Sequence, residues 1–363
     1  MTSAPPTALP APPLPSAPSR APVIVAAVAI GLALAVVAIA AIPVLLLERA
    51  EDWRAYAEAA TAIRSGTPLY IWTTYPDIRS FGQHAYLYPP PLAAIWAVGL
   101  TPESFLVLKA IGLGASTWAL ARATGAARWL AVVIAALAVT SPPAIHDLVL
   151  GNVMVIVAAA VCLSLARPGW LGSATLGVVC AVALKPTIGP YIVWLLLRRR
   201  DSFVRAFAAG VATTLVFVLV LGPGRYVEYI QALPKTAVLA APFTGNLGLS
   251  AISPLAGVAG IVVAYVWTLA AAIRLDERAA AVVALAMTQL AQPTIGLNYA
   301  VLLVPAVILL WAVDRRAAVA MAVVLPIVVI VSPVLAAVLL AGAATVAAVA
   351  HGRPVVGARP AVG

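Results

Sequence analysis

Asp52 is the acidic residue whose position most favours chemistry. It opens the segment Asp52-Trp53-Arg54-Ala55-Tyr56 in a chain of 363 residues that holds only 12 Asp and Glu. A carboxylate within hydrogen-bond reach of a hydroxyl accepts its proton while the oxygen attacks an electrophile. The alternative role is structural, because an aspartate at the N-cap of a helix stabilises that helix by about 1 kcal/mol. The sequence leaves both roles of Asp52 open.

Lys185 is the second candidate, because it stands before Pro186 between two apolar runs and is one of only three lysines. A charge at membrane depth is costly and usually marks a pathway, a partner or a ligand. A departing phosphate would need such a cation, since negative charge grows on it as the bond breaks. The alternative is a lysine that snorkels to the interface. Arg225 and Lys235 are further candidates for phosphate, and each also fits a solvated charge.

The pair His146-Asp147 is a candidate for contacts with hydroxyl groups of a ligand, with an ordinary loop pair as the alternative. His84 and His146 form no metal-ligand spacing, so we expect no metal site. No Gly-rich loop follows a strand, so we expect no bound nucleotide, and we predict no cofactor. Cys162 and Cys180 both lie in apolar runs and are predicted to be unpaired.

The composition identifies an integral membrane protein. Hydrophobic residues make up 64% of the chain and charged residues 9%, whereas soluble domains carry roughly 25% charged residues. The formal net charge of +10 comes mostly from arginine. In a membrane protein such an excess marks cytoplasmic loops, so membrane lipids are the expected surroundings and no nucleic acid is expected.

The apolar runs define the elements that must position these residues. Residues 1–22 are rich in Pro and Ala and are predicted to form a disordered cytoplasmic tail, and residues 351–363 form a second tail. A first transmembrane helix is predicted for Val23 to Leu47, and residues 23–350 form one membrane domain. Further apolar runs occur at 104–121, 129–141, 151–166, 170–184, 187–197, 203–222, 249–273, 279–292, 299–313, 317–332 and 334–350. The expected fold is all-α and polytopic, with about 10–12 transmembrane helices, some of them broken or re-entrant.

The positions of the arginines predict how the chain is oriented in the membrane. Placing the arginine-rich loops and both termini inside gives a threading of about twelve crossings, with residues 49–88 as the first extracytoplasmic loop. This threading requires Pro89 to Leu100 to be a partial or interfacial helix. Within the loop, apolar residues at spacings of three and four predict an amphipathic surface helix over residues 53–64 that ends at Gly66, with Asp52 at its N-cap.

Several motifs stand in order along residues 23–340. They are Asp52-Trp53-Arg54-Ala55-Tyr56, Gly66-Thr67-Pro68-Leu69-Tyr70, Tyr86-Leu87-Tyr88-Pro89-Pro90, Gly151-Asn152, Leu184-Lys185-Pro186, Leu195 to Arg200, Asn246 to Ser250, and Pro293 to Pro305 around Asn298-Tyr299. This ordered set resembles the polytopic glycosyltransferases of the C superfamily. Within that superfamily it resembles the bacterial polyprenyl-phosphate-mannose-dependent α-(1,2)-mannosyltransferases.

The resemblance implies roles for individual residues. Asp52 matches the acidic residue of the first outer loop that acts as catalytic base. The family often has glutamine at the position of Asn152, and His-Tyr where this chain has Asn298-Tyr299. Asparagine can hydrogen-bond a phosphate or a hydroxyl but carries no proton or charge at neutral pH. The candidate substrate contacts are Tyr56, Tyr86, Tyr88, His146, Asp147, Asn152, Asn246 and Asn298.

The function that follows is transfer of a sugar, with mannose favoured, from a polyprenyl-phosphate donor to a hydroxyl of a glycolipid acceptor. The reaction would invert the anomeric centre at the outer face of the cytoplasmic membrane, with Asp52 as base and Lys185 and Arg225 on the phosphate. Two alternatives remain, a secondary transporter or lipid flippase and an inactive relative of the transferases. A transporter should place ionisable residues near the midplane, and apart from Lys109 and Lys185 the spans have almost none.

Overall fold

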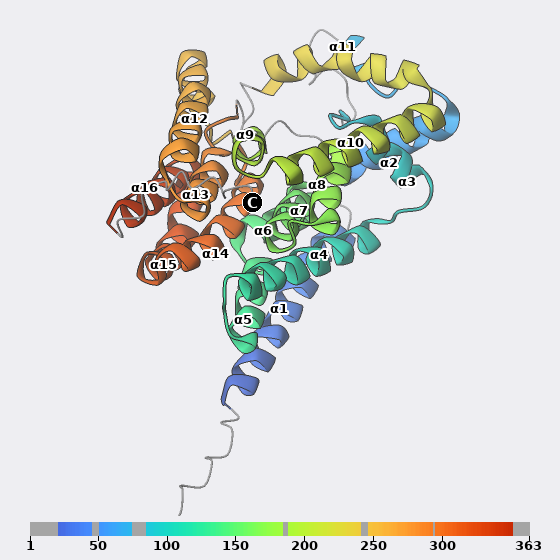
Figure 1. Cartoon of the computed structure of the whole chain (residues 1–363). Helices are drawn as coiled ribbons and strands as arrows, with labels where there is room; N and C mark the ends of the chain where they lie inside the picture. The colour runs from blue at the N-terminus through green and yellow to red at the C-terminus, as the bar shows by residue number, and fades with distance from the viewer. Residues whose placement is uncertain are drawn as a thin grey trace, which may run out of the picture.

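The computed structural model describes residues 21–45, 51–74, 85–183, 188–240, 246–292 and 295–350, and every regular element in these ranges is a helix (Figure 1). The elements are α1 (Ala21–Leu45), α2 (Glu51–Ser65), η1 (Ile71–Thr74), α3 (Pro90–Ala97), α4 (Pro102–Ala123), α5 (Arg128–Val139), α6 (Pro142–Leu150), α7 (Met154–Ala166), α8 (Trp170–Ala183), α9 (Gly189–Arg198), α10 (Arg200–Leu221), α11 (Pro223–Ala240), η4 (Leu249–Ala251), α12 (Pro254–Arg274), α13 (Glu277–Met287), η5 (Leu297–Leu302), α14 (Leu303–Val313), α15 (Arg315–Val331) and α16 (Pro333–Ala350). Most boundaries fall within a few residues of the predicted apolar runs.

Five of the described helices are long and apolar enough to cross a membrane, namely α1, α4, α10, α12 and α16. The consecutive helices α5 and α6 pass the same test as a pair bent by 51°, which makes up to six. The sequence-based number of about 10–12 crossings also counted shorter apolar segments, which form helices such as α7 and α8. The predicted class, an all-α polytopic membrane protein, is confirmed.

Two helices were missed by the search for apolar runs. Residues 142–150, interpreted as a loop, form α6, which begins at two prolines and ends at Gly151 with φ +79°. Residues Pro223–Ala240, which no predicted apolar run covers, form α11 with Pro234 inside it. Polar residues interrupt the apolar pattern in both segments, which explains why hydropathy alone did not find them.

The segment predicted to form the first extracytoplasmic loop contains the predicted amphipathic helix. This helix, α2, runs from Glu51 to Ser65 and is followed by Gly66 at φ +74°, a conformation that glycine adopts at no steric cost. Because the helix begins at Glu51, Asp52 lies inside its first turn and not at the predicted N-cap. The predicted short helix before the second span is also present, as α3. The two tails lie outside the described residues, except that Ala21 and Pro22 already belong to α1.

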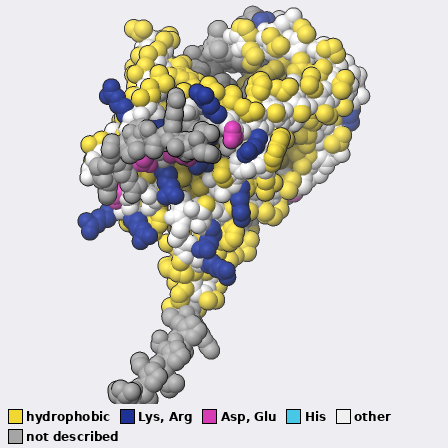
Figure 2. Space-filling model, in the orientation of Figure 1, with side chains coloured by type: hydrophobic (Ala, Val, Ile, Leu, Met, Phe, Trp, Pro, Cys, Tyr) yellow, Lys and Arg dark blue, Asp and Glu magenta, His cyan; other side chains and the backbone are white. Residues whose placement is uncertain are grey.

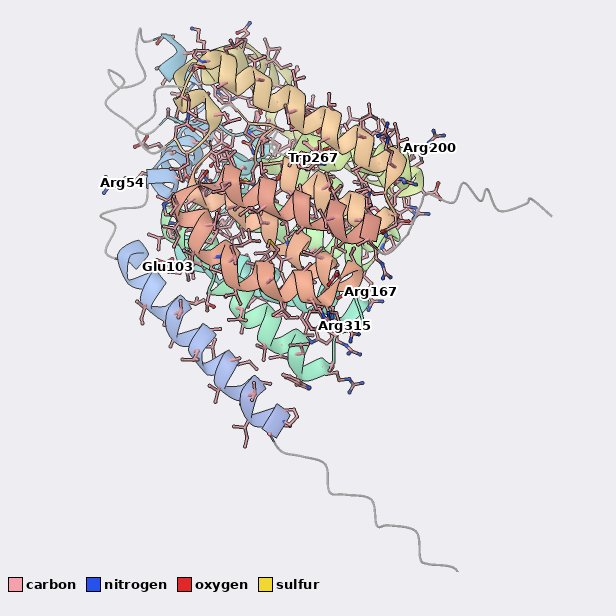
Figure 3. All side chains as sticks on the ribbon, turned by 90° about the vertical axis from the view of Figure 1, so that its left-hand side faces the viewer. Arg54, Glu103, Arg167, Arg200, Trp267 and Arg315 are labelled. Carbon is pink, nitrogen blue, oxygen red and sulfur yellow. The ribbon has the colours of Figure 1, made fainter. Side chains whose placement is uncertain are left out.

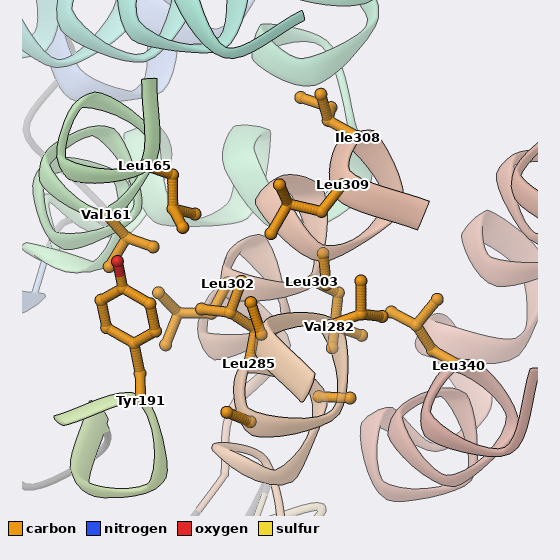
Figure 4. Close-up of a cluster of buried hydrophobic side chains, with 14 of the residues drawn as sticks. Val161, Leu165, Tyr191, Val282, Leu285, Leu302, Leu303, Ile308, Leu309 and Leu340 are labelled. Atoms are coloured by element: carbon orange, nitrogen blue, oxygen red, sulfur yellow. The ribbon is translucent and has the colours of Figure 1, made fainter. Parts of the chain in front are cut away.

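The largest hydrophobic core is organised around α13. Every residue from Ala279 to Met287 is buried, and a helix that is apolar on all sides needs neighbours on all sides. The neighbours are α9, α12, α14 and α16. Figure 4 shows Val282 and Leu285 of α13 among side chains of α7, α9, α14 and α16, including Val161, Leu309 and Leu340. Cys162 lies buried in this core and Cys180 is half-buried against it, and both are free, as predicted.

Helices α8 and α10 pack closely and run in the same direction. Pro168 lies against Ser202, and further along Gly177 lies against Ala206. Because the residue numbers increase together along the two segments, the helices run in the same direction. A Cβ atom on Gly177 would lie 1.9 Å from the carbonyl oxygen of Ala206, so only glycine permits this approach. Both helices therefore begin at the same end of the bundle.

The two ends of the bundle carry different charges. In Figure 3, Arg54 and Glu103 lie at one end, and Arg167, Arg200 and Arg315 lie at the other. Figure 2 faces the second end and shows Lys and Arg side chains gathered over it. We call the first the Asp52 end and the second the arginine end.

Candidate active site

Asp52 is held by a residue one hundred positions further along the chain. Nδ2 of Asn152 donates a hydrogen bond to Oδ2 of Asp52 at 2.7 Å, and the hydroxyl of Tyr88 lies 3.5 Å from the same oxygen. The Asp52 side chain stays partly exposed. Hydrogen bonds from neutral donors fix the direction of a carboxylate without neutralising its charge. The arrangement therefore presents an oriented carboxylate at the end of the helix bundle, which is what a general base requires.

A tight turn between α6 and α7 places Asn152. Gly151 has φ +79°, and the N–H groups of Gly151 and Asn152 both donate to the carbonyl oxygen of Asp147, at 3.0 and 3.2 Å. Oδ1 of Asn152 accepts the N–H of Val153 at 2.8 Å, which leaves its NH₂ group directed at Asp52. A Cβ atom on Gly151 would lie 2.5 Å from the ring of Trp53. Only glycine lets α2 approach the turn this closely.

Replacement of Gly151 by alanine should destabilise the protein and loosen the Asp52–Asn152 contact. Gly125 provides the matched control, because it also follows a helix with positive φ, +90°, but nothing lies within 4 Å of its added Cβ. Both variants bear the strain of the left-handed backbone, and only Gly151→Ala must also displace Trp53, at an additional cost of about 1–3 kcal/mol. The difference between the melting temperatures of the two purified variants measures the Trp53 contact. Equal melting temperatures would contradict it.

Lys109, a fully buried lysine on α4, binds the turn between α6 and α7 from the interior of the bundle. Its Nζ lies 2.5 Å from Oδ1 of Asp147 and donates to the carbonyl oxygens of Asp147 at 3.0 Å and Asn152 at 2.5 Å. The other carboxylate oxygen of Asp147 accepts the N–H of Met154 at 2.9 Å, at the start of α7. The ammonium group also lies 5.8 Å from the ring centroid of Trp53. Lys109 thus links α2, α4, α6 and α7, and sequence reasoning gave it no role.

Asp147 was a candidate for contact with sugar hydroxyls. The structure buries this carboxylate completely and gives both of its oxygens intramolecular partners. A sugar cannot reach this carboxylate in this arrangement, so we assign Asp147 to the ion pair with Lys109. Its neighbour His146 remains a candidate, because the side chain is half-buried and its Nδ1 atom is buried without a hydrogen-bond partner in the described part of the chain.

Aromatic rings fill the space between α2, α3 and the loop before α3. Tyr56 is fully buried, and its ring centroid lies 5.2 Å from that of Tyr88 and 5.3 Å from that of Trp96. Burial raises the pKa of the Tyr56 hydroxyl well above its usual value, and the nearby charge of Asp52 raises it further. This hydroxyl therefore stays protonated beside Asp52 at any physiological pH.

The Tyr-Pro-Pro stretch is a rigid joint. The hydroxyl of Tyr86 donates to the carbonyl oxygen of Pro89 at 2.6 Å and accepts the N–H of Ala93 at 2.9 Å, so it bonds the first turn of α3. The hydroxyl of Tyr70 donates to the carbonyl oxygen of Tyr88 at 2.6 Å. Burial raises the pKa of the Tyr86 hydroxyl, so it remains a donor. Tyr86 thereby fixes the backbone that carries Tyr88 towards Asp52.

Buried amides line the second half of the bundle near α6. The segment η5, which contains Asn298, packs against α6 and α7. Nδ2 of Asn298 and Nε2 of Gln292 are buried and have no hydrogen-bond partner among the described residues. Oδ1 of Asn246 accepts the N–H groups of Gly248 and Ile295, so Asn246 joins two loops. An unsatisfied buried donor costs about 1–3 kcal/mol, so Asn298 and Gln292 keep hydrogen-bonding capacity that no described residue uses.

Of the three phosphate candidates, Arg225 and Lys235 lie among the described residues, and Nζ of Lys235 donates to the carbonyl oxygen of Thr73. Lys185 lies outside the described residues. Arg225 lies on α11, where its Nη1 donates to the carbonyl oxygen of Thr67 at 2.6 Å and lies 3.5 Å from the carboxylate of Glu228. Glu228 in turn accepts the N–H of Leu69 at 3.2 Å. Arg225 therefore fastens α11 to the loop before η1, and binding a phosphate would require a change of partners.

No group of three or more His, Cys, Asp or Glu side chains that could hold a metal ion occurs in the part of the chain that the structure describes. The polar side chains described around Asp52 are amides and phenols. Together with the fold, these groups define a polytopic helical membrane protein with an oriented carboxylate at one end of its bundle.

The comparison with protein families gives the class a name. The family model of glycosyltransferase family 87 matches residues 86–295, which is more than half of the chain. The chain belongs to glycosyltransferase family 87 and is a membrane glycosyltransferase, in agreement with the resemblance to transferases of the C type. Comparisons with curated proteins and with solved structures gave no match. The matched region contains Lys109, Asp147 and Asn152, and Asp52 precedes it.

Proposed function

We propose that this glycosyltransferase moves a sugar, with mannose favoured, from a polyprenyl-phosphate donor to a hydroxyl of a lipid-linked glycan at the outer face of the cytoplasmic membrane. The observation that carries the proposal is the partly exposed carboxylate of Asp52, held at 2.7 Å by the amide of Asn152. The all-helical membrane body suits substrates that are themselves embedded in the bilayer.

The proposed chemistry is a single displacement. The acceptor oxygen attacks the anomeric carbon of the donor, Asp52 takes the hydroxyl proton, and the bond between the sugar and the polyprenyl phosphate breaks with inversion. A positioned base of this kind contributes about 10²- to 10⁴-fold to the rate. The amides of Asn298 and Gln292 would bind sugar hydroxyls, and His146 would contribute a ring nitrogen.

The departing phosphate needs a positive charge close to it. We assign this role to Lys185, with Arg225 as a second cation if it exchanges its present partners. Lys185→Ala should then weaken binding of the donor more than binding of the acceptor. Lys185→Arg should restore binding only in part, because a planar guanidinium replaces a compact ammonium.

Transfer from a radiolabelled donor tests the proposal directly. The purified protein in lipid nanodiscs should label a glycolipid acceptor from polyprenyl-phosphate mannose and not from a nucleotide sugar. Transfer from polyprenyl-phosphate arabinose in place of mannose would retain the donor class and change the sugar. Efficient transfer from a nucleotide sugar alone would refute the donor class.

The proposed orientation places Thr74 outside the cell. Thr74 is exposed at the end of η1, and a cysteine introduced there should react with a membrane-impermeant thiol reagent added to intact cells. Arg315 lies at the opposite end (Figure 3), so Arg315→Cys should be labelled only after the cells are lysed. The reverse pattern would invert the topology and move the Asp52 end to the cytoplasm.

A further inference from the structure

A pocket of about 580 Å³ lies at the arginine end of the bundle, opposite the Asp52 site, where α8, α9 and α10 meet. The residues that line it are Pro168, Gly169, Leu197, Arg198, Arg199, Arg200, Asp201, Ser202 and Arg205. Figure 2 faces this end of the molecule. The pocket lies at the other end of the bundle and takes no part in the proposed chemistry at Asp52.

Positive charge dominates the lining. Four arginines line the pocket together with one acid, Asp201, and a second acid, Glu277, lies 2.5 Å from Nε of Arg199. Four positive charges against these two carboxylates leave a net positive site. Arginine offers a planar fork of donors that matches the oxygens of a phosphate group. The charge and the donor type therefore favour an anion with several oxygens.

Two helix N-termini add to this charge. The helices α8 and α10 run in the same direction, and their first residues, Trp170 and Arg200, lie beside or in the lining. The first N–H groups of a helix lack intrahelical partners and carry partial positive charge. No side chain caps the N-terminus of α10. Such helix ends are common binding sites for phosphate groups.

Some hydrogen-bond donors of the pocket arginines bind backbone carbonyl groups, and others have no partner among the described residues. Nη2 of Arg198 donates to the carbonyl oxygen of Leu275 at 2.6 Å, and Nη1 of Arg205 donates to that of Pro168 at 3.2 Å. Nε of Arg198 and Nη1 of Arg199 are buried without a hydrogen-bond partner in the described ranges. Arginines that only set the orientation of a membrane protein need neither a pocket nor buried, unpartnered donors. Two of the four arginines that line the pocket therefore keep hydrogen-bond donors that no described residue uses.

The apolar surroundings of the pocket indicate which kind of molecule carries the anionic group. Large apolar side chains are exposed next to the pocket on all three helices, at Trp170, Leu171, Leu196, Leu197 and Phe207. Exposed apolar side chains in a membrane protein face acyl chains, and a tryptophan there marks the headgroup level. Basic pockets between transmembrane helices are known to bind anionic headgroups. We propose that this pocket binds the phosphate group of an anionic membrane lipid whose acyl chains lie along α8 and α10.

Lipid binding to the purified full-length protein tests this proposal without any measurement of sugar transfer. Native mass spectrometry in neutral detergent should show one phosphatidylglycerol bound about tenfold or more tightly than phosphatidylcholine, because the choline cation cancels the charge of the phosphate and is repelled by the arginines. In the double variant Arg200→Gln/Arg205→Gln this preference should disappear. Arg200→Gln alone alters an exposed side chain, so it provides the test if the double variant does not fold.

The matched control is Arg315→Gln/Arg316→Gln, which removes two exposed arginines from the same end but outside the pocket. It should keep the preference for phosphatidylglycerol. Equal losses in the two double variants would indicate a general basic surface and overturn the pocket. Millimolar inorganic phosphate should compete with the lipid. If phosphate bound with the same dependence on Arg200 and Arg205 while phosphatidylglycerol did not bind, the lipid source would be wrong.

Discussion

Asp52→Asn should lower the rate of sugar transfer by about 10²- to 10⁴-fold, because a neutral amide cannot take the proton of the acceptor hydroxyl. The change keeps the size of the side chain, and its amide oxygen can still accept the hydrogen bond from Asn152 that holds Asp52 at 2.7 Å. The melting temperature should fall only slightly, because a carboxylate in the first turn of a helix contributes about 0.3–1 kcal/mol through the helix dipole. Turnover from a radiolabelled donor, measured beside thermal melting of the same preparation, checks both expectations.

Glu58→Gln is the matched control, because it removes a carboxylate from the same helix, α2. It should retain activity close to that of the natural protein. Asp52→Glu keeps the charge and moves it by one methylene, so part of the activity should remain. If Asp52→Asn turned over at the natural rate, the base would have to be Glu51, Glu58 or Asp77, and Asp52 would serve only the surface helix.

Lys109→Met should lower the stability of the protein more than the added methyl group of Gly151→Ala does. The change removes one partner of a fully buried ion pair and leaves the carboxylate of Asp147 without its cation. Breaking a buried pair in this way typically costs about 3–5 kcal/mol. Sugar transfer should fall as well, because the carbonyl oxygen of Asn152 loses its donor and the turn that aims Asn152 at Asp52 loosens. Thermal melting of the purified variant, with the exposed Lys235→Met as control, measures the first effect.

The double variant Lys109→Met/Asp147→Asn separates the ion pair from general damage to the core. It removes both charges, and the amide oxygen of the new asparagine can still accept the N–H of Met154 that Asp147 now binds. The loss of stability should therefore be smaller than the sum of the losses in the two single variants, by about 0.5–3 kcal/mol as found for residues in contact. Additive losses would show that Lys109 and Asp147 act independently and that the ion pair is not their main role.

Hydropathy and local pattern were sufficient for the class of protein and for most of its helices. A run such as 203–222 contains few charges and becomes α10, because a bilayer leaves a long apolar segment no other stable state. The apolar spacing at residues 53–64 predicted α2, and the threading through the membrane predicted a short helix over Pro89 to Leu100, which is found as α3. The apolar runs and spacings are local properties, since each depends on residues within a few turns of one another.

The connections between distant residues were decided by the tertiary structure. Asp52 was singled out from the sequence, but Asn152 lies one hundred residues further on, and nothing in the local pattern shows that its amide meets this carboxylate. The pair His146-Asp147 was interpreted from its position as an outer contact, whereas packing of α4 against α6 turns Asp147 inward to Lys109.

The sequence by itself therefore determined that this is an all-α membrane protein and which residues are chemically able to act, because hydrophobicity and side-chain chemistry belong to single residues and short segments. The tertiary structure alone decided that Asn152 orients Asp52, that Lys109 secures the turn carrying Asn152, and that Pro168 and Gly169 join the arginines of residues 198–205 in one pocket. The physical reason is that hydrogen bonds and ion pairs act over about 3 Å, and only the packing of helices brings such distant parts of the chain that close.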